Sequence, residues 1–143
     1  MEAEGGGQVD VKSCSTVDST EVGNIGSGAD ALLDALGAPF TIACPAFPVN
    51  KRTIYLGHLF VGDELLSDSP MRNHPLTPMR DANLVRVLGR QTRRRVELVP
   101  WTVVRRGADA IRNEFARLAA NGGHAVVDAM DDEDPMASGA ARR

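Results

Sequence analysis

The stretch from Lys12 to Cys44 indicates the fold of this chain; it reads KSCSTVDSTEVGNIGSGADALLDALGAPFTIAC. A polar, glycine-containing turn comes first. An amphipathic helix is predicted over Ser27–Leu36, because apolar residues recur there at intervals of three and four. Gly37 is a natural helix end, and the apolar run Phe40–Cys44 is typical of a buried strand. With a short strand expected at Gln8–Lys12, the stretch predicts a β-α-β unit.

The remaining sequence continues this alternation of strands and helices. A hairpin is predicted over Thr53–Leu66 with its turn at Gly62–Asp63, where glycine supplies a positive φ. The other expected elements are a helix capped by Asp81 and running to Leu88, a strand at Val96–Val99, a helix at Ala108–Ala120 that buries Ile111, Phe115 and Leu118, and a strand at Ala125–Asp128. The sequence therefore predicts the α/β class: a partial layered sheet with flanking helices and one β-hairpin.

Composition places the chain among ordinary globular domains. It has 143 residues, of which 43% are apolar and 24% are charged, enough for one domain with a core. The net charge of −3 gives no reason to expect a nucleic-acid partner, and no apolar run approaches the roughly 20 residues that span a membrane. Two cysteines, Cys14 and Cys44, favour a cytoplasmic setting with reduced thiols. No histidines, cysteines or carboxylates have metal-ligand spacing, so no bound metal is expected.

The turn from Lys12 to Gly26 carries the chemistry of the sequence. A helix N-terminus presents N–H groups and a partial positive charge, glycines allow close approach, and hydroxyls add donors. Such a segment is suited to a carboxylate or phosphate, although Ser, Thr and Gly also occur in ordinary helix caps. The string GNIGSG lacks the phosphate-loop pattern and is not interpreted as an ATP site.

The order of residues in this turn is also specific. KSCSTVDSTEVGNIG resembles the K-x-C-S-T-x-D-S-T-x-x-G-N-I-G signature of the four-carbon acid sugar kinases, most of all the 3-oxo-tetronate kinase branch. The resemblance continues through Ala43–Thr92 and Gly107–Asp134. It implies that residues 8–130 form an incomplete acid-sugar-binding N-terminal domain, between a flexible start at 1–7 and a disordered tail at 131–143.

By this resemblance, intact family members have a second, nucleotide-binding domain and use ATP and Mg²⁺ to phosphorylate a hydroxyl of 3-oxo-tetronate. This sequence has neither the family's opening Asp-Asp-x-Thr-Gly loop, which supplies the expected catalytic base, nor the glycine-rich nucleotide-binding region. We therefore expect a truncated reading frame whose product, by itself, binds no ATP or Mg²⁺, contains no catalytic residue and has no kinase activity. Its ligand would be the acid sugar alone.

The resemblance implies a substrate site made by side chains of the signature and one later arginine. Lys12 would neutralise the carboxylate, the signature hydroxyls and amide would bind the sugar hydroxyls, and Arg52 would clamp the carboxylate with two hydrogen bonds. The alternatives are a solvated strand-end lysine, a capped helix start and a loop arginine. Val22 stands where the family has Arg or Lys, which weakens the expected affinity. The predicted substrate-binding residues are Lys12, Asp18, Ser19, Thr20, Asn24 and Arg52.

Two other functions stay open. One is a non-catalytic remnant that only binds ligands or associates with itself, because missing neighbours would expose strand edges and apolar side chains. The side chains expected at such surfaces are Ile42, Val96, Leu98, Val126 and Val127. The other is a nucleic-acid binder that uses the basic cluster Arg90–Arg95. The acidic total charge, the single Trp and the single Tyr argue against it.

Overall fold

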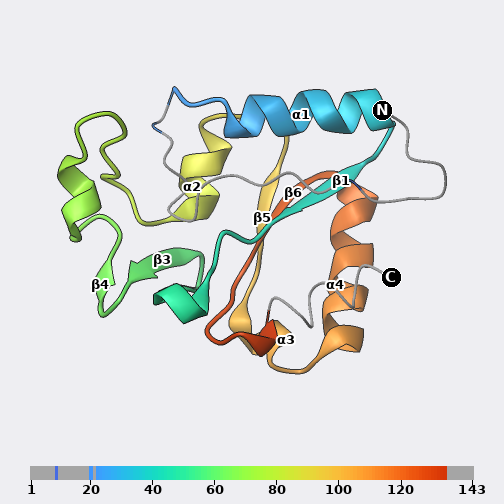
Figure 1. Cartoon of the computed structure of the whole chain (residues 1–143). Coiled ribbons are helices and arrows are strands. Elements are labelled where there is room, and N and C mark those ends of the chain that lie inside the picture. The colour runs from blue at the N-terminus through green and yellow to red at the C-terminus, as the bar shows by residue number, and fades with distance from the viewer. Residues whose placement is uncertain (1–8, 10–19, 21, 135–143) are drawn as a thin grey trace.

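A three-stranded parallel sheet forms the centre of the computed structural model, which describes Val9, Thr20 and residues 22–134. Its strands are β1 (Phe40–Ala43), β5 (Val96–Val99) and β6 (Gly123–Val127), in the order β1-β6-β5 (Figure 1). Helices cover both faces, as is usual for parallel strands. The predicted α/β class is therefore confirmed.

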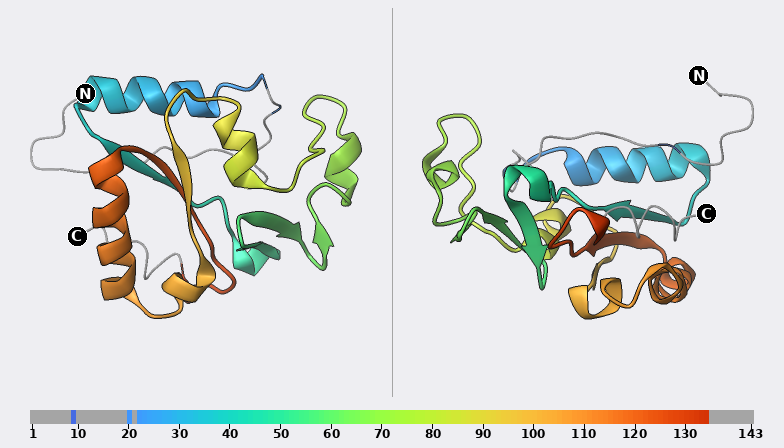
Figure 2. Two further views of the ribbon diagram at one scale, coloured as in Figure 1. Left: turned by 180° about the vertical axis from the view of Figure 1, so that it is seen from behind. Right: turned by 60° about the horizontal axis from the view of Figure 1, so that its bottom comes forward.

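The helices divide between the two faces of the sheet. On one face lie α1 (Ile25–Leu36) and α2 (Leu84–Gly89). On the other lie α3 (Trp101–Val104) and α4 (Ala108–Asn121), as the right-hand view of Figure 2 shows for α1, α3 and α4. The predictions of α1 and α4 are confirmed, and α4 buries the expected Ile111, Phe115 and Leu118. The last apolar residue of α1, Leu36, is exposed rather than buried.

Strand β6 is the central strand, and alternate residues of it enter two separate cores. Val126 packs in the cluster that contains Leu84 and Leu88 of α2. Ala125 and Val127 pack in the cluster of α3 and α4. The expectation that Val126 and Val127 would be exposed is wrong, because β1 and β5 flank this strand and helices cover it. Ile42, Val96 and Leu98, on the two outer strands, are partly buried.

A second, antiparallel sheet lies beyond the carboxyl end of the first. It contains β2 (Arg52–Tyr55), β3 (His58–Val61) and β4 (Glu64–Leu65). The predicted turn at Gly62–Asp63 joins β3 to β4, but the predicted single hairpin is divided by a further turn at Leu56–Gly57. Both residues of that turn have positive φ, 48° and 75°, as a two-residue hairpin turn of type I′ requires. Two hydrogen bonds between Ile54 and Ala129 join this sheet to the chain after β6.

Two short 3₁₀ helices, Pro48–Asn50 and Pro70–Asn73, flank this second sheet. The cap of α2 differs from the prediction. Asn83 rather than Asp81 caps the helix, because its side chain accepts a hydrogen bond from the Arg86 N–H at 3.0 Å. Asp81 instead receives the Asn83 N–H at 3.0 Å and forms ion pairs with Arg86 and Arg90.

The predicted strand at Gln8–Lys12 and the predicted start at 1–7 lie outside the described residues, apart from Val9. Of the predicted tail, residues 131–134 are described. There the Asp134 carboxylate accepts the Met130 N–H at 2.7 Å, and Asp134 is buried. No helix in the described part of the chain has the length and apolar character needed to cross a membrane.

Candidate functional site

The described part of the signature turn leads directly into α1. Asn24 is the residue before the helix, and its side chain makes no capping hydrogen bond. Its backbone carbonyl accepts the Gly28 N–H at 2.8 Å, while the residue itself is exposed. Asn24 itself therefore provides no side-chain cap for α1, and the residue is exposed at the start of the helix.

Gln91, which follows α2, holds the two ends of this turn. Its Nε2 donates a 2.7 Å hydrogen bond to the Thr20 carbonyl, and its Oε1 accepts the Gly26 N–H at 3.1 Å. Gly26 lies so close that a Cβ placed on it would be 2.7 Å from the Gln91 Cβ. Ordinary contacts between carbons are about 3.5–4 Å, so only glycine fits here without movement.

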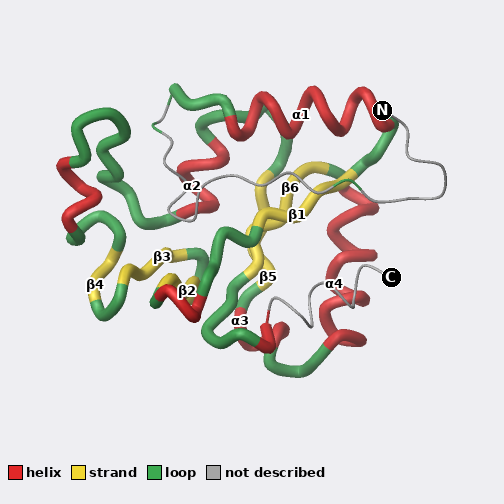
Figure 3. Tube along the Cα trace, in the orientation of Figure 1, coloured by secondary structure: helices red, strands yellow, loops and turns green. Residues whose placement is uncertain are grey.

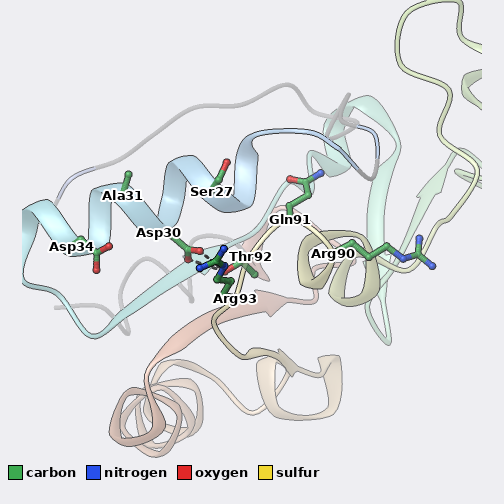
Figure 4. A pocket seen from close by; sticks show the side chains of 8 residues that line it. All are labelled: Ser27, Asp30, Ala31, Asp34, Arg90, Gln91, Thr92 and Arg93. Carbon is green, nitrogen blue, oxygen red and sulfur yellow. Dashed lines mark hydrogen bonds between the residues drawn. The ribbon is translucent and has the colours of Figure 1, made fainter.

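An open pocket of about 470 Å³ lies beside the turn, between α1 and the segment after α2. Ser27, Asp30, Ala31 and Asp34 line it from α1, and residues 90–93 line it from the other side (Figure 4). Figure 4 shows the Arg90 side chain pointing away from α1, in agreement with its ion pair to Asp81 at 3.3 Å. The pocket is therefore lined by the carboxylates of Asp30 and Asp34 on one side and by Thr92 and Arg93 on the other.

Asp30 joins α1 to the sheet through the side chain of His124. His124 Nε2 lies 2.6 Å from Asp30 Oδ1, and the Thr92 hydroxyl donates to both carboxylate oxygens at 2.6 and 2.8 Å. An ionised carboxylate only accepts hydrogen bonds, so Nε2 is the donor in this pair. Burial raises the pKa of Asp30, but the hydrogen bonds from Thr92 and His124 outweigh it and leave that pKa below its ordinary value.

The basic cluster Arg90–Arg95 is partly neutralised by neighbouring carboxylates. Arg90 pairs with Asp81, and Arg94 pairs with both Asp30 and Asp34 of α1. The two pairs of Arg94 connect the segment after α2 to α1, the helix that follows the signature turn.

Arg52 lies apart from the described signature residues. It begins β2, and its Nη1 donates to the Asn50 carbonyl at 2.7 Å, while its Nε is buried and has no hydrogen-bond partner among the described residues. Figure 3 shows the start of α1 along the upper edge of the molecule and β2 in its lower left part. Within the part of the chain that the structure describes, no hydrogen bond joins Arg52 to Thr20 or Asn24. Lys12, Asp18 and Ser19 lie outside the described residues.

Asp128 is a buried carboxylate that the sequence analysis did not single out. Its Oδ2 accepts the N–H groups of Leu56 and Trp101 at 2.7 and 2.8 Å, and its Oδ1 accepts the Gly57 N–H at 2.9 Å. Burial raises its pKa, and these three hydrogen bonds oppose the increase. Asp128 thus fixes the hairpin turn and the start of α3 at the carboxyl end of β6. Its position directly after a buried strand was the available signal.

No group of three or more His, Cys, Asp or Glu side chains suited to a metal ion occurs among residues 22–134, the continuous described range, or at Val9 and Thr20.

The chain matches a known protein family over almost its whole length, and the match includes the polar turn at the start of α1. Residues 1–142 match the family model described as "Sugar-binding N-terminal domain". The chain belongs to this family. A 3-oxo-tetronate kinase of Burkholderia multivorans is 58% identical to this sugar-binding domain over 142 residues, which are 99% of the chain and 33% of the relative. A 3-oxo-tetronate kinase of Haemophilus influenzae is 54% identical over 121 residues, 84% of the chain and 29% of the relative.

The sugar-binding domain also resembles solved structures. A Haemophilus influenzae protein matches with a TM-score of 0.87 and 50% identity, over 91% of this chain and 32% of that one. A Bordetella bronchiseptica protein, described with bound citrate as a domain-swapped dimer, matches with a TM-score of 0.66 and 26% identity, over 90% and 29%. The chain spans about a third of the length of the curated relatives it matches. The resemblance to 3-oxo-tetronate kinases is confirmed.

Proposed function

We propose that this chain supplies the substrate-binding side of an ATP-dependent kinase that phosphorylates 3-oxo-tetronate. The observation that supports this proposal most directly is the signature turn, which ends at the start of α1. There Asn24 is exposed, and its side chain makes no capping hydrogen bond. The name shared by relatives at 47–58% identity gives the substrate class.

The chemistry of the proposed ligand suits this turn. A four-carbon acid sugar has one carboxylate and several hydroxyls, which need a positive potential and paired donors and acceptors. The N-terminus of α1 supplies the potential, and Thr20 and Asn24 supply a hydroxyl and an amide. Lys12, Asp18 and Ser19 of the signature complete the proposed site. Lys12 is proposed to neutralise the carboxylate and Arg52 to clamp it with two hydrogen bonds.

In such an enzyme, ATP and Mg²⁺ supply the phosphoryl group and neutralise its charge. The role proposed for the residues of this chain is to bind and orient the acid sugar. A 3-oxo-tetronate kinase would act in the cytoplasm, where ATP is made and where Cys14 and Cys44 stay reduced.

Titration of the 143-residue chain with 3-oxo-tetronate, followed by NMR, tests this proposal. We expect the amide signals of residues 20–26 to move first, with a Kd of about 1 mM or weaker, which corresponds to roughly 4 kcal/mol. Asn24→Ala should weaken this binding, whereas Arg112→Ala, on the outer surface of α4, should not. Shifts confined to Arg93–Arg95 would contradict the assignment.

Self-association is a second candidate function. Exposed apolar side chains occur at the start of and within the first 3₁₀ helix and at the β2–β3 turn: Phe47 is 48%, Val49 69%, Tyr55 38% and Leu56 48% exposed. Exposed apolar surface favours association, and one structural relative is a domain-swapped dimer. Light scattering after size exclusion should give a mass above that of one chain, and Val49→Lys should reduce it. A monomer at all concentrations would rule this function out.

A further inference from the structure

We infer that Gln91 is a positioning residue for substrate binding: its side-chain amide holds the signature turn in the conformation that presents Thr20 and Asn24. The inference rests on the proposed function, which supplies the identity of the ligand. The contact between Gln91 and the turn comes from the structure itself.

Both halves of the Gln91 amide are used. The NH₂ group donates to the Thr20 carbonyl at 2.7 Å, and the amide oxygen accepts the Gly26 N–H at 3.1 Å. Thr20 and Gly26 are the two ends of the described turn, and they are 71 and 65 residues from Gln91 in the sequence. A side chain that offers a donor and an acceptor at the same planar group satisfies both ends at once.

The Gly26 N–H belongs to the first turn of α1, where N–H groups have no partner within the helix. Gln91 supplies the missing acceptor. The Thr20 carbonyl also accepts the Gly23 N–H at 2.8 Å, so the Gln91 amide completes the second acceptor position of that oxygen. The contact therefore replaces hydrogen bonds that the turn cannot make by itself.

Gln91 is itself held firmly. The residue is only 8% exposed, and its backbone N–H donates to the carbonyl of Leu88, a buried residue of α2, at 2.9 Å. The next residue, Thr92, binds Asp30 one turn further along α1. Two successive residues thus fix the start of α1. Gln91 bonds to the turn at Thr20 and Gly26, and Thr92 bonds to the helix at Asp30.

A turn that is fixed before the ligand arrives loses less conformational entropy on binding. Without the Gln91 amide, the turn would have to be ordered by the ligand. We therefore expect Gln91 to determine affinity without contacting the ligand.

Two variants of the whole chain separate the two hydrogen bonds. Gln91→Met keeps the length of the side chain and removes both bonds. Gln91→Glu keeps the acceptor for the Gly26 N–H but places a second carboxylate oxygen against the Thr20 carbonyl. The control is Ser69→Ala: this hydroxyl is buried and bonds to Leu66 and Met71, so its loss destabilises the fold without touching the turn.

Three quantities are measured for each protein: hydrogen exchange of the Gly26 amide, stability in urea, and NMR affinity for 3-oxo-tetronate. Gln91→Met should accelerate Gly26 exchange and weaken the affinity, each by about tenfold or more, while the amides of β6 stay protected. Gln91→Glu should keep Gly26 protected and give an intermediate affinity. Ser69→Ala should lower stability and leave the affinity of the folded protein unchanged.

Unchanged Gly26 exchange in Gln91→Met would overturn the inference. The inference would also be overturned if the loss of affinity were no greater than the fraction of unfolded protein accounts for, because a purely structural residue would give that result. If the wild-type chain binds no 3-oxo-tetronate, the proposed function fails. The exchange measurement then decides by itself whether Gln91 orders the turn.

Discussion

His124 in the central strand and Asp30 in α1 form a hydrogen bond of 2.6 Å between His124 Nε2 and Asp30 Oδ1. The His124 side chain is 1% exposed, and 94 residues separate the partners in the sequence. The bond ties the helix that follows the signature turn to the most buried strand of the sheet. The placement of the turn thus depends on polar contacts as well as on apolar packing.

Removal of the Asp30 carboxylate should destabilise the fold. Asp30→Ala leaves the buried His124 Nε2 and the Thr92 hydroxyl without their acceptor, at a cost of about 2–3 kcal/mol. Asp34, one turn later on the same helix, is the control, because its side chain is 70% exposed. Asp34→Ala should change stability by no more than about 0.5 kcal/mol. Urea denaturation measures both; equal losses would show that the Asp30 contacts add nothing.

The lowered pKa of Asp30 predicts how its contribution depends on pH. In the folded protein this carboxylate stays ionised at pH values below 3.8, the ordinary pKa of an aspartate. Its stabilisation is therefore complete above about pH 4 and is lost as the pH falls through the lower pKa of the folded state. When urea denaturation is repeated from pH 5 down to about pH 2.5, the difference in stability between wild type and Asp30→Asn should narrow. A difference that grows on acidification would contradict the prediction.

Asp128 should be among the most sensitive positions for stability. Asp128→Ala leaves three backbone N–H groups without an acceptor, those of Leu56, Gly57 and Trp101. We expect a loss of about 3 kcal/mol or more, because each unsatisfied buried donor costs about 1–3 kcal/mol. Asp128→Asn retains one acceptor oxygen and should lose less. Asp109→Ala is the control, since that side chain is 94% exposed; a comparable loss there would refute the role of Asp128.

The long elements could be predicted because their periodicity is strong. The spacing of Ile111, Phe115 and Leu118 marks α4, and the apolar run after Gly123 marks β6. The four residues of α3 are too few to show a helical period. The turn at Leu56–Gly57 was missed because leucine rarely adopts a positive φ, and the surrounding sequence reads as a continuous strand.

The site was less predictable than the fold. The turn around Asn24 could be found from its own residues, since loop polarity and helix start are local signals. The partners that hold it and the following helix are Gln91, Thr92 and His124. They lie 62 to 94 residues in the sequence from the residues of the turn and of α1 that they contact. A single sequence carries no signal for such pairs, because their geometry is set by how α1, α2 and the sheet pack together.

Two glycines of α1 should respond in opposite ways to the same substitution. In Gly26→Ala the new Cβ would lie 2.7 Å from the Gln91 Cβ and 2.8 Å from the Gln91 backbone carbonyl. Forcing these atoms apart should cost about 1–3 kcal/mol and should also weaken acid-sugar binding, because the Gly26–Gln91 hydrogen bond is displaced.

Gly28 is two residues later in the same helix, and a Cβ placed there would meet nothing within 4 Å. Gly28→Ala should therefore stabilise the protein by about 0.5–1 kcal/mol, since alanine favours the helix more than glycine does. Urea denaturation of both variants gives the difference directly, and NMR titration with 3-oxo-tetronate gives the affinities. A Gly26→Ala protein with wild-type stability and wild-type affinity would mean that the close contact between α1 and Gln91 does not fix the turn. If Gly28→Ala alone stabilises the chain and retains wild-type affinity, the contact at position 26, rather than the helical propensity of α1, sets the geometry of the site.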